Sequence, residues 1–367
     1  PIHKMSEKPL MVAAMSGGVD SSVTAALLVE QGYRVVGMML RLWSEPGREE
    51  SNRCCTPDAM AQARRVAQQL GIPFYAIDVR ERFRESVVQS FLDGYRLGET
   101  PNPCVVCNRE IRWGALYEQA RLVGAEYMAT GHYARIRRSP DGTASLLKGL
   151  DEGKDQSYVL SVLTQEQLQH SLFPVGEYQK SEVRDLARQF GLTSAARPDS
   201  QDLCFLAGED YRSFLARIVP ETLQSGEIVD RRGRVLGRHD GLAFYTTGQR
   251  KGLGISSPEP LYVLEKIPDL NRLVVGDAGE LGRSDMTVED LNWMDGSEPS
   301  LLAGGELFNV EVKIRYKANP VEAHISILPD HKVRVQFNRP LRDITPGQRA
   351  VFYQGAICLG GGKIQAL

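Results

Sequence analysis

The first half of the chain alternates short apolar runs with segments whose apolar residues recur roughly every three or four positions. Short apolar runs are typical of buried strands, and the longer period is typical of amphipathic helices. The expected strands are 10–15, 34–40, 74–78 and 127–130, and the expected helices are 20–31, 58–70, 108–123 and 182–190. Strands that alternate with helices predict an α/β fold with a parallel, doubly wound, Rossmann-like sheet.

The pattern changes twice further along the chain. Residues 134–138 and 146–149 flank a Ser-Pro-Asp-Gly turn, which predicts a hairpin. After about residue 207, glycine and short strand-like runs become frequent, and from about Leu307 period-two segments dominate. We therefore expect three domains: an ATP-binding catalytic domain over 1–207, a small β-rich middle domain over 208–289, and a C-terminal β-barrel over 290–367.

Composition places the chain among soluble globular proteins. It has 367 residues, 42% of them hydrophobic, and a formal net charge of −2. No apolar run is long enough to cross a membrane, and the polar start does not look like a secretory leader. Six cysteines are too few for a disulfide scaffold in a chain of this length. We expect a cytoplasmic protein in which cysteines serve catalysis or metal binding.

A glycine-rich loop joins the first expected strand to the first expected helix. Its sequence is Ser-Gly-Gly-Val-Asp-Ser-Ser, residues 16–22. Glycines let the backbone approach a phosphate, and the helix N-terminus offers amide groups and a partial positive charge. The loop lacks the Gly-Lys-Ser/Thr ending of a kinase-type P-loop, so γ-phosphoryl transfer is not favoured. It resembles the PP-loop of ATP pyrophosphatases, which cleave between the α- and β-phosphates and adenylate a carbonyl oxygen.

Three cysteines stand in polar segments. Cys104 and Cys107 lie in a Pro-Asn-Pro-Cys-Val-Val-Cys run that leads into a helix, and a helix N-terminus lowers the pKa of a thiol. Cys204 follows Asp-Ser-Gln-Asp-Leu. The sequence has no second Cys-x-x-Cys to complete a zinc site. These three cysteines are candidates for reaction chemistry, whereas Cys54, Cys55 and Cys358 are expected to be structural.

Together, the segments resemble the bacterial tRNA-specific 2-thiouridylases. They follow the order of that family over nearly the whole chain, and the combination is more specific than the PP-loop alone. The matching segments are 14–22, 100–110, 129–133, 154–158, 199–205, 245–254, 315–316, 345–348 and 358–362.

The resemblance implies ATP-dependent 2-thiolation of the wobble uridine of tRNA, with Mg²⁺ as a cofactor. The ATP-binding residues that it implies are Ala14, Met15, Ser16, Gly17, Gly18, Val19, Asp20, Ser21, Leu40 and Gly131. The residues that it places against the target base or the tRNA are Asn102, Pro103, Cys104, His132, Lys154, Asp155, Gln156, Arg315, Tyr316 and Gln348. The implied partners are the tRNAs for lysine, glutamate and glutamine, together with a sulfur donor such as a cysteine desulfurase or a sulfur-relay protein.

The resemblance also assigns catalytic roles, with one departure. Asp20 would help to organise metal and phosphates, Cys107 would be the nucleophile, and Cys204 would carry a persulfide. Many members of the family have Asp where this chain has Cys104, which puts the proton-handling role of that position in doubt. Two alternatives stay open: a persulfide relay between Cys107 and Cys204, or a [4Fe–4S] cluster held by Cys104, Cys107 and Cys204.

Two other functions compete with thiolation. A small-molecule ligase or synthetase of the PP-loop type would explain the loop but not the three cysteines. A tRNA-binding protein without enzymatic activity would explain neither the intact loop nor the cysteines. ATP turnover on an amino-acid substrate without tRNA would favour the first, and tRNA binding without ATP cleavage would favour the second.

Overall fold

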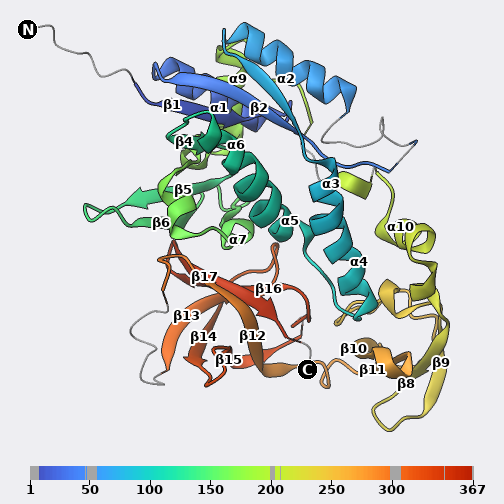
Figure 1. Ribbon diagram of the computed structural model, residues 1–367. Coiled ribbons are helices and arrows are strands. Elements are labelled where there is room, and N and C mark those ends of the chain that lie inside the picture. The colour runs from blue at the N-terminus through green and yellow to red at the C-terminus, as the bar shows by residue number, and fades with distance from the viewer. Residues whose placement is uncertain are drawn as a thin grey trace, which may run out of the picture.

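The computed structural model describes residues 8–45, 47, 56–198, 203–206, 208–297, 307–342 and 344–365, which form three β-sheets (Figure 1). The first sheet has the order β3-β2-β1-β4-β7, and every neighbouring pair in it is parallel. This confirms the predicted parallel sheet. Its strands are β1 (Leu10–Ala14), β2 (Arg34–Arg41), β3 (Phe74–Asp78), β4 (Tyr127–Ala129) and β7 (Ser171–Leu172).

Helices cover both faces of this sheet because successive strand residues point to opposite sides. Met11 and Ala13 pack with Leu28 of α1 (Val19–Glu30). Val12, between them, packs with Trp113 and Leu116 on the other face. The first face also carries α2 (Pro57–Gln69) and α9 (Lys180–Gln189), whose apolar residues join one cluster with those of α1.

A helical arm extends from the edge of the sheet toward the other domains. It consists of α3 (Arg80–Phe83), the π-helical segment η2 (Arg84–Val88) and α4 (Gln89–Arg96). A second run follows as α5 (Pro103–Val106), the π-helical segment η3 (Cys107–Leu116) and α6 (Tyr117–Leu122). The expected helix 108–123 is therefore present, but it starts earlier and is π-helical where it carries Cys107. Segments of π-helix are often found at functional sites.

Short elements complete the catalytic domain and continue between the strands of the middle domain. They are α7 (Ser157–Leu160), α8 (Gln165–Gln169), η4 (Pro174–Glu177), η5 (Cys204–Leu206), α10 (Tyr211–Ile218), η6 (Pro220–Leu223), η7 (Leu242–Phe244) and η8 (Pro268–Leu270). The middle domain is a mixed sheet of order β10-β11-β8-β9, with a small core around Ile228, Val263 and Leu273. Its strands are β8 (Gly226–Val229), β9 (Val235–His239), β10 (Tyr262–Ile267) and β11 (Arg272–Gly276).

The last six strands form an antiparallel barrel, as predicted, and it closes where β12 pairs with β17. The strands are β12 (Arg283–Trp293), β13 (Phe308–Lys313), β14 (Val321–Ile327), β15 (Val333–Leu341), β16 (Arg349–Gln354) and β17 (Ile357–Ile364). The expected domain boundary at 290 falls inside β12. The predicted hairpin, β5 (Ala134–Arg138) and β6 (Ala144–Lys148), pairs with β17 through Leu147 and Ile357, so a part of the catalytic domain extends the barrel sheet. None of the described helices is both long and apolar enough to span a membrane.

Candidate active site

The glycine-rich loop turns between β1 and α1 with its backbone closely packed. Gly17 has a φ of +74°, and a Cβ there would lie 2.4 Å from the carbonyl oxygen of Ala59, so only glycine fits. The Ser21 hydroxyl accepts a hydrogen bond from the Ser16 amide at 3.1 Å and holds the loop in this shape. Among the described residues, no side chain caps the N-terminus of α1. The predicted ATP-binding loop therefore presents a helix N-terminus that suits an anion.

Asp20 lies in the first turn of α1 and has two partners from distant segments. The Lys180 ammonium lies 2.6 Å from the Asp20 Oδ1 atom, and the Tyr133 hydroxyl donates to the same oxygen at 2.8 Å. The Lys180 side chain is only 13% exposed and that of Asp20 is 31% exposed. This arrangement brings a cation to the phosphate loop, a feature that the loop sequence itself lacks.

The other predicted ATP contacts lie beside the loop. A Cβ at Gly131, which follows β4, would lie 2.8 Å from the Ser21 amide nitrogen, so this backbone packs directly against the start of α1. Leu40 is half-buried near the end of β2. Arg197 donates to the Gly17 carbonyl at 3.1 Å and pairs with Asp58 at 2.6 Å. The predicted nucleotide residues thus gather around the carboxyl ends of the strands, where ligands bind in open α/β sheets.

His132 is buried, which bears on its expected contact with tRNA. Its Nε2 atom lies 2.7 Å from the Arg112 guanidinium, and its Nδ1 atom lies 2.7 Å from the Thr130 hydroxyl. Burial, with a contribution from Arg112, holds the pKa of His132 well below its usual 6.5. The ring is therefore neutral and accepts from Arg112, so Nδ1 carries the proton and donates to Thr130. In this structure Arg112, which is half-buried, is the more accessible of the pair.

Cys107 and Cys204 pack against the same apolar cluster, which includes Phe83, Phe91 and Phe205. Both thiols are half-buried, whereas Cys104 is exposed. Leu40 packs against this cluster as well. The fold thus packs two of the three candidate cysteines against one apolar cluster, together with Leu40 of β2, the strand beside the one that leads into the glycine-rich loop.

The three cysteines do not form a group that could hold a single metal ion in the described part of the chain. No three His, Cys, Asp or Glu side chains in the described part of the chain group closely enough to hold a metal ion, and Cys104, Cys107 and Cys204 are all described. A cluster needs its thiolates to converge on one centre. The absence of such a group concerns a single metal ion, so the [4Fe–4S] alternative stays a prediction. Cys358, expected to be structural, is buried in β17, and burial raises the pKa of its thiol to about 12. Cys54 and Cys55 lie outside the described residues.

The residues expected to touch the target base lie where the catalytic domain meets the barrel. Asn102 is the N-cap residue of α5, next to Pro103, and its side chain lies near Tyr158. The Tyr316 side chain lies near Gln156. Burial raises the pKa of its phenol, and nearby charge on Asp155 and Cys104 adds to this effect.

The remaining predicted tRNA residues divide into interface and interior positions. Arg315 donates to the Thr247 carbonyl of the middle domain at 3.2 Å, and Gln348 donates to the Thr100 carbonyl at 2.7 Å. Asp155 is buried and accepts from the Gly149 and Ser157 amides, so its carboxylate holds a turn. Lys154, one residue earlier, is half-buried in that turn.

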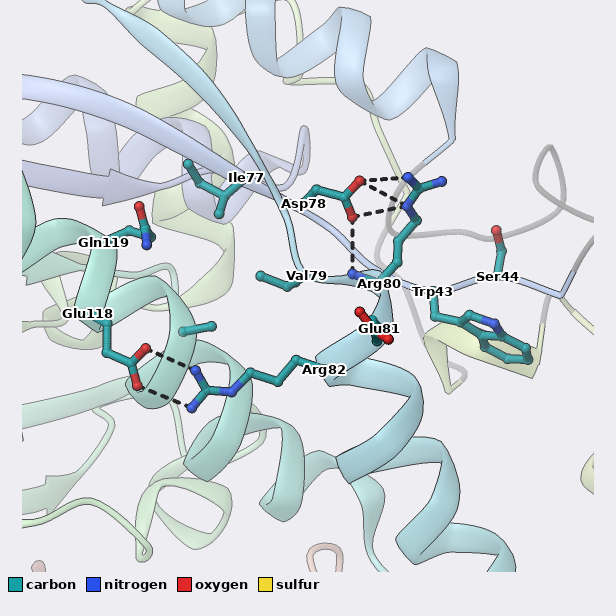
Figure 2. Close-up of a pocket in the computed structure, with 11 residues that line it drawn as sticks. Trp43, Ser44, Ile77, Asp78, Val79, Arg80, Glu81, Arg82, Glu118 and Gln119 are labelled. Carbon is teal, nitrogen blue, oxygen red and sulfur yellow. Dashed lines mark hydrogen bonds and ion pairs between the residues drawn. The ribbon is translucent and has the colours of Figure 1, made fainter.

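A separate cavity of about 700 Å³ opens at the carboxyl ends of β2 and β3 (Figure 2). Two ion pairs stand in its wall, Asp78 with Arg80 and Arg82 with Glu118. Arg80 holds the pKa of Asp78 below its usual value. None of the residues described as lining it was predicted as a site residue.

Comparison with known proteins identifies the family. A tRNA-specific 2-thiouridylase MnmA from Magnetococcus marinus is 47% identical over 98% of this chain and 100% of its own length. Proteins of the same name from Carboxydothermus hydrogenoformans and Chloroflexus aurantiacus are 47% and 48% identical, over 97% and 96% of this chain and 97% and 98% of their own lengths. The chain belongs to the tRNA-specific 2-thiouridylase family.

Three family models match consecutive parts of the chain. They are described as a tRNA methyl transferase HUP domain (residues 10–208), a tRNA methyl transferase PRC-barrel domain (212–277) and an aminomethyltransferase β-barrel domain (283–364). These ranges follow the three sheets. The last one begins at Arg283 with β12, as the barrel does.

Sequence reasoning missed several residues that shape the site of this thiouridylase family member. Lys180 and Arg197 contact the glycine-rich loop although they lie 160 and 180 residues further along the chain than Asp20 and Gly17, their partners in the loop. No local pattern indicates such contacts. Tyr133 belongs to segment 129–133, which is part of the resemblance, so its position in the sequence could have indicated a role in the site.

Proposed function

We propose that this chain replaces the 2-oxygen of the wobble uridine of tRNA with sulfur, at the expense of ATP. The observation that carries the proposal is the shared environment of Cys107 and Cys204. A sulfur relay requires two thiols, and here they come from distant segments. Leu40, one of the expected ATP-binding residues, packs against the same apolar cluster as both thiols. Membership of the family supports the same reaction.

Activation comes first, because the C2 oxygen of uracil is a poor leaving group. ATP bound at the loop of residues 14–21 would transfer its adenylyl group to that oxygen and release pyrophosphate. The amide groups at the start of α1 and the Lys180 ammonium would bind the phosphates. Mg²⁺, when bound, offsets phosphate charge, and it commonly uses one or two carboxylates together with phosphate oxygens, so the Asp20 carboxylate is its candidate protein ligand.

Sulfur transfer follows in two steps. A persulfide on Cys204 attacks C2 through its terminal sulfur, and AMP departs with the original oxygen. The Cys107 thiolate then attacks the Cys204 sulfur, the sulfur–sulfur bond to the base breaks, and the bond electrons remain on the new thiocarbonyl sulfur. A Cys107–Cys204 disulfide is left, which an external dithiol reduces. A donor of persulfide sulfur, such as a cysteine desulfurase or a relay protein, would reload Cys204.

The junction of the three domains supports a tRNA substrate rather than a small molecule. Asn102, Gln348 and Arg315 bring the catalytic domain, barrel and middle domain together at the predicted base site. A flipped anticodon base fits such a junction because loop bases are already partly unstacked. We expect the substrates to be the tRNAs for lysine, glutamate and glutamine, and the site of action to be the cytoplasm.

The test is a reconstituted reaction of the purified chain with tRNA, ATP, Mg²⁺ and a persulfide donor. Mass spectrometry of the digested tRNA should show 2-thiouridine, and chromatography should show AMP and pyrophosphate. Cys107→Ser should be inactive, and the matched control Cys358→Ala, altered in the barrel, should be active. Methylated uridine would support the methyl transferase descriptions instead. AMP release without any change in tRNA would refute the proposal.

A further inference from the structure

The segment between α4 and α5 leads directly to the candidate base site, and its neighbours pack against it tightly. A Cβ at Gly98 would lie 2.7 Å from the Cγ of Pro268 in the middle domain, and one at Gly94 would lie 2.9 Å from Pro101. Gly347 of the barrel has a φ of +86°, and a Cβ there would lie 2.7 Å from that of Glu99. Figure 1 shows the end of α4 between the barrel strands and β10–β11.

Glu99 is the charged centre of this contact. Its side chain is only 13% exposed, and its Oε1 atom lies 2.8 Å from the ammonium of Lys363 on β17. The ammonium of Lys266 on β10 lies 3.5 Å from the Glu99 carbonyl and 3.0 Å from the Tyr245 carbonyl. Glu99 therefore stands between a lysine of the barrel and a lysine of the middle domain.

Backbone contacts continue from Glu99 toward Cys107. The Thr100 amide donates to the Pro346 carbonyl at 3.0 Å, and Gln348 donates to the Thr100 carbonyl at 2.7 Å. Asn102 then occupies the N-cap position of α5, and Cys107 begins η3 directly after that helix. A cavity of about 330 Å³ beside the segment is lined by residues of both domains, Glu99, Asn102, Gln348 and Lys363 among them.

We propose that Glu99 is a positioning residue, which holds the segment 99–102 against the barrel and the middle domain so that Asn102 and Cys107 meet the target uridine in register. The inference rests on the proposed function. The ion pair between Glu99 and Lys363 does not touch the reacting atoms. It fixes the position of the target base, held by the tRNA-contacting domains, relative to the nucleophile. A small displacement of a reacting group lowers the rate of reaction more than it lowers affinity.

The test measures kcat and KM for tRNA thiolation with Glu99→Gln and Lys363→Met. Each should lower kcat by about tenfold to a hundredfold while KM changes little. The double variant should be no slower than the slower single variant, because both remove one interaction. The matched control is Glu311→Gln, which removes the ion pair of 3.3 Å between Glu311 in the barrel and Lys148 in the catalytic domain. It should retain the wild-type kcat.

Melting temperatures, and kcat measured at a lower temperature, separate a loss of positioning from a loss of stability. If Glu99→Gln proves unstable, Lys363→Met tests the same contact from the barrel side. A wild-type kcat in both variants, or a loss of activity that follows stability and disappears on cooling, would overturn the positioning role. An equal loss in Glu311→Gln would also overturn it, because any domain contact would then serve. If the wild type itself forms no 2-thiouridine, the proposed function fails and the inference falls with it.

Discussion

Removal of the Lys180 ammonium is expected to lower the rate of catalysis much more than it lowers the stability of the fold. Lys180 pairs with Asp20 at 2.6 Å, and its side chain is 13% exposed. Fully exposed pairs contribute about 0–1 kcal/mol, and the loss of one partner from a fully buried pair costs about 3–5 kcal/mol. Asp20 is 31% exposed and keeps the Tyr133 hydroxyl, so Lys180→Met should cost about 1–2 kcal/mol of stability.

The catalytic cost should be larger. A lysine at the phosphate loop would stabilise the charge that develops on the departing pyrophosphate, and the loss of one such donor typically lowers kcat by about 10²–10³-fold. The assay follows tRNA-dependent AMP formation by chromatography, well below the melting temperature. Lys332→Met, which alters a lysine paired with Asp330 in the barrel, is the control and should retain full activity. A folded Lys180→Met protein that releases AMP at the wild-type rate would refute the assignment of Lys180 to the phosphate site.

Three further predictions concern thiols, pH and a buried arginine. Cys104→Asp should keep thiolation under anaerobic conditions, because the proposed relay uses only Cys107 and Cys204 and the Cys104 side chain is exposed; a brown wild type with stoichiometric iron and a dead variant would establish the iron–sulfur cluster instead. Burial lowers the pKa of Lys266 from 10.5 to about 8, so between these values the unfolded chain holds a proton that the folded chain lacks. The free energy of unfolding should therefore rise with pH over that window, relative to Lys266→Met, by at most about 3 kcal/mol, and parallel pH profiles in urea unfolding would contradict this. Arg349→Met should destabilise the junction by about 2–4 kcal/mol, because buried Arg349 donates to Ser161 and to the Gly361 carbonyl, and an unchanged urea midpoint would refute this.

The sheets were predictable because their signal is local. The first three strands and the helices between them follow from the apolar period together with local start and stop signals, and each observed element lies within about two residues of the expected one. The arm of residues 80–96 was missed, although Phe83, Val87, Phe91 and Tyr95 recur at helical spacing and are all buried. The hairpin was predicted, but its union with the barrel depends on one pairing between Leu147 and Ile357, which no local pattern encodes.

The site was predictable in its parts rather than in its connections. The loop of residues 16–22 and the three cysteines were found from their residue types, but only the fold shows that Cys107 and Cys204 pack against one apolar cluster while Cys104 is exposed. His132 and Asp155 were expected to contact tRNA, and the structure buries both in hydrogen-bonded positions. Burial of a polar residue depends on distant packing, so a motif alone does not indicate it. Direct contact of His132 and Asp155 with tRNA therefore stays a prediction. It can be tested on Arg112, which contacts His132 and is more accessible.

The central claim is that Cys204 delivers sulfur and Cys107 releases it. The most direct measurement is a single turnover of protein that carries a persulfide on Cys204, mixed with tRNA and ATP and without a reductant. Alkylation, digestion and mass spectrometry would then count disulfides and 2-thiouridines together. The account predicts one Cys107–Cys204 disulfide for each 2-thiouridine formed. Formation of 2-thiouridine while both thiols remain reduced, or a disulfide that joins Cys104 instead, would contradict it.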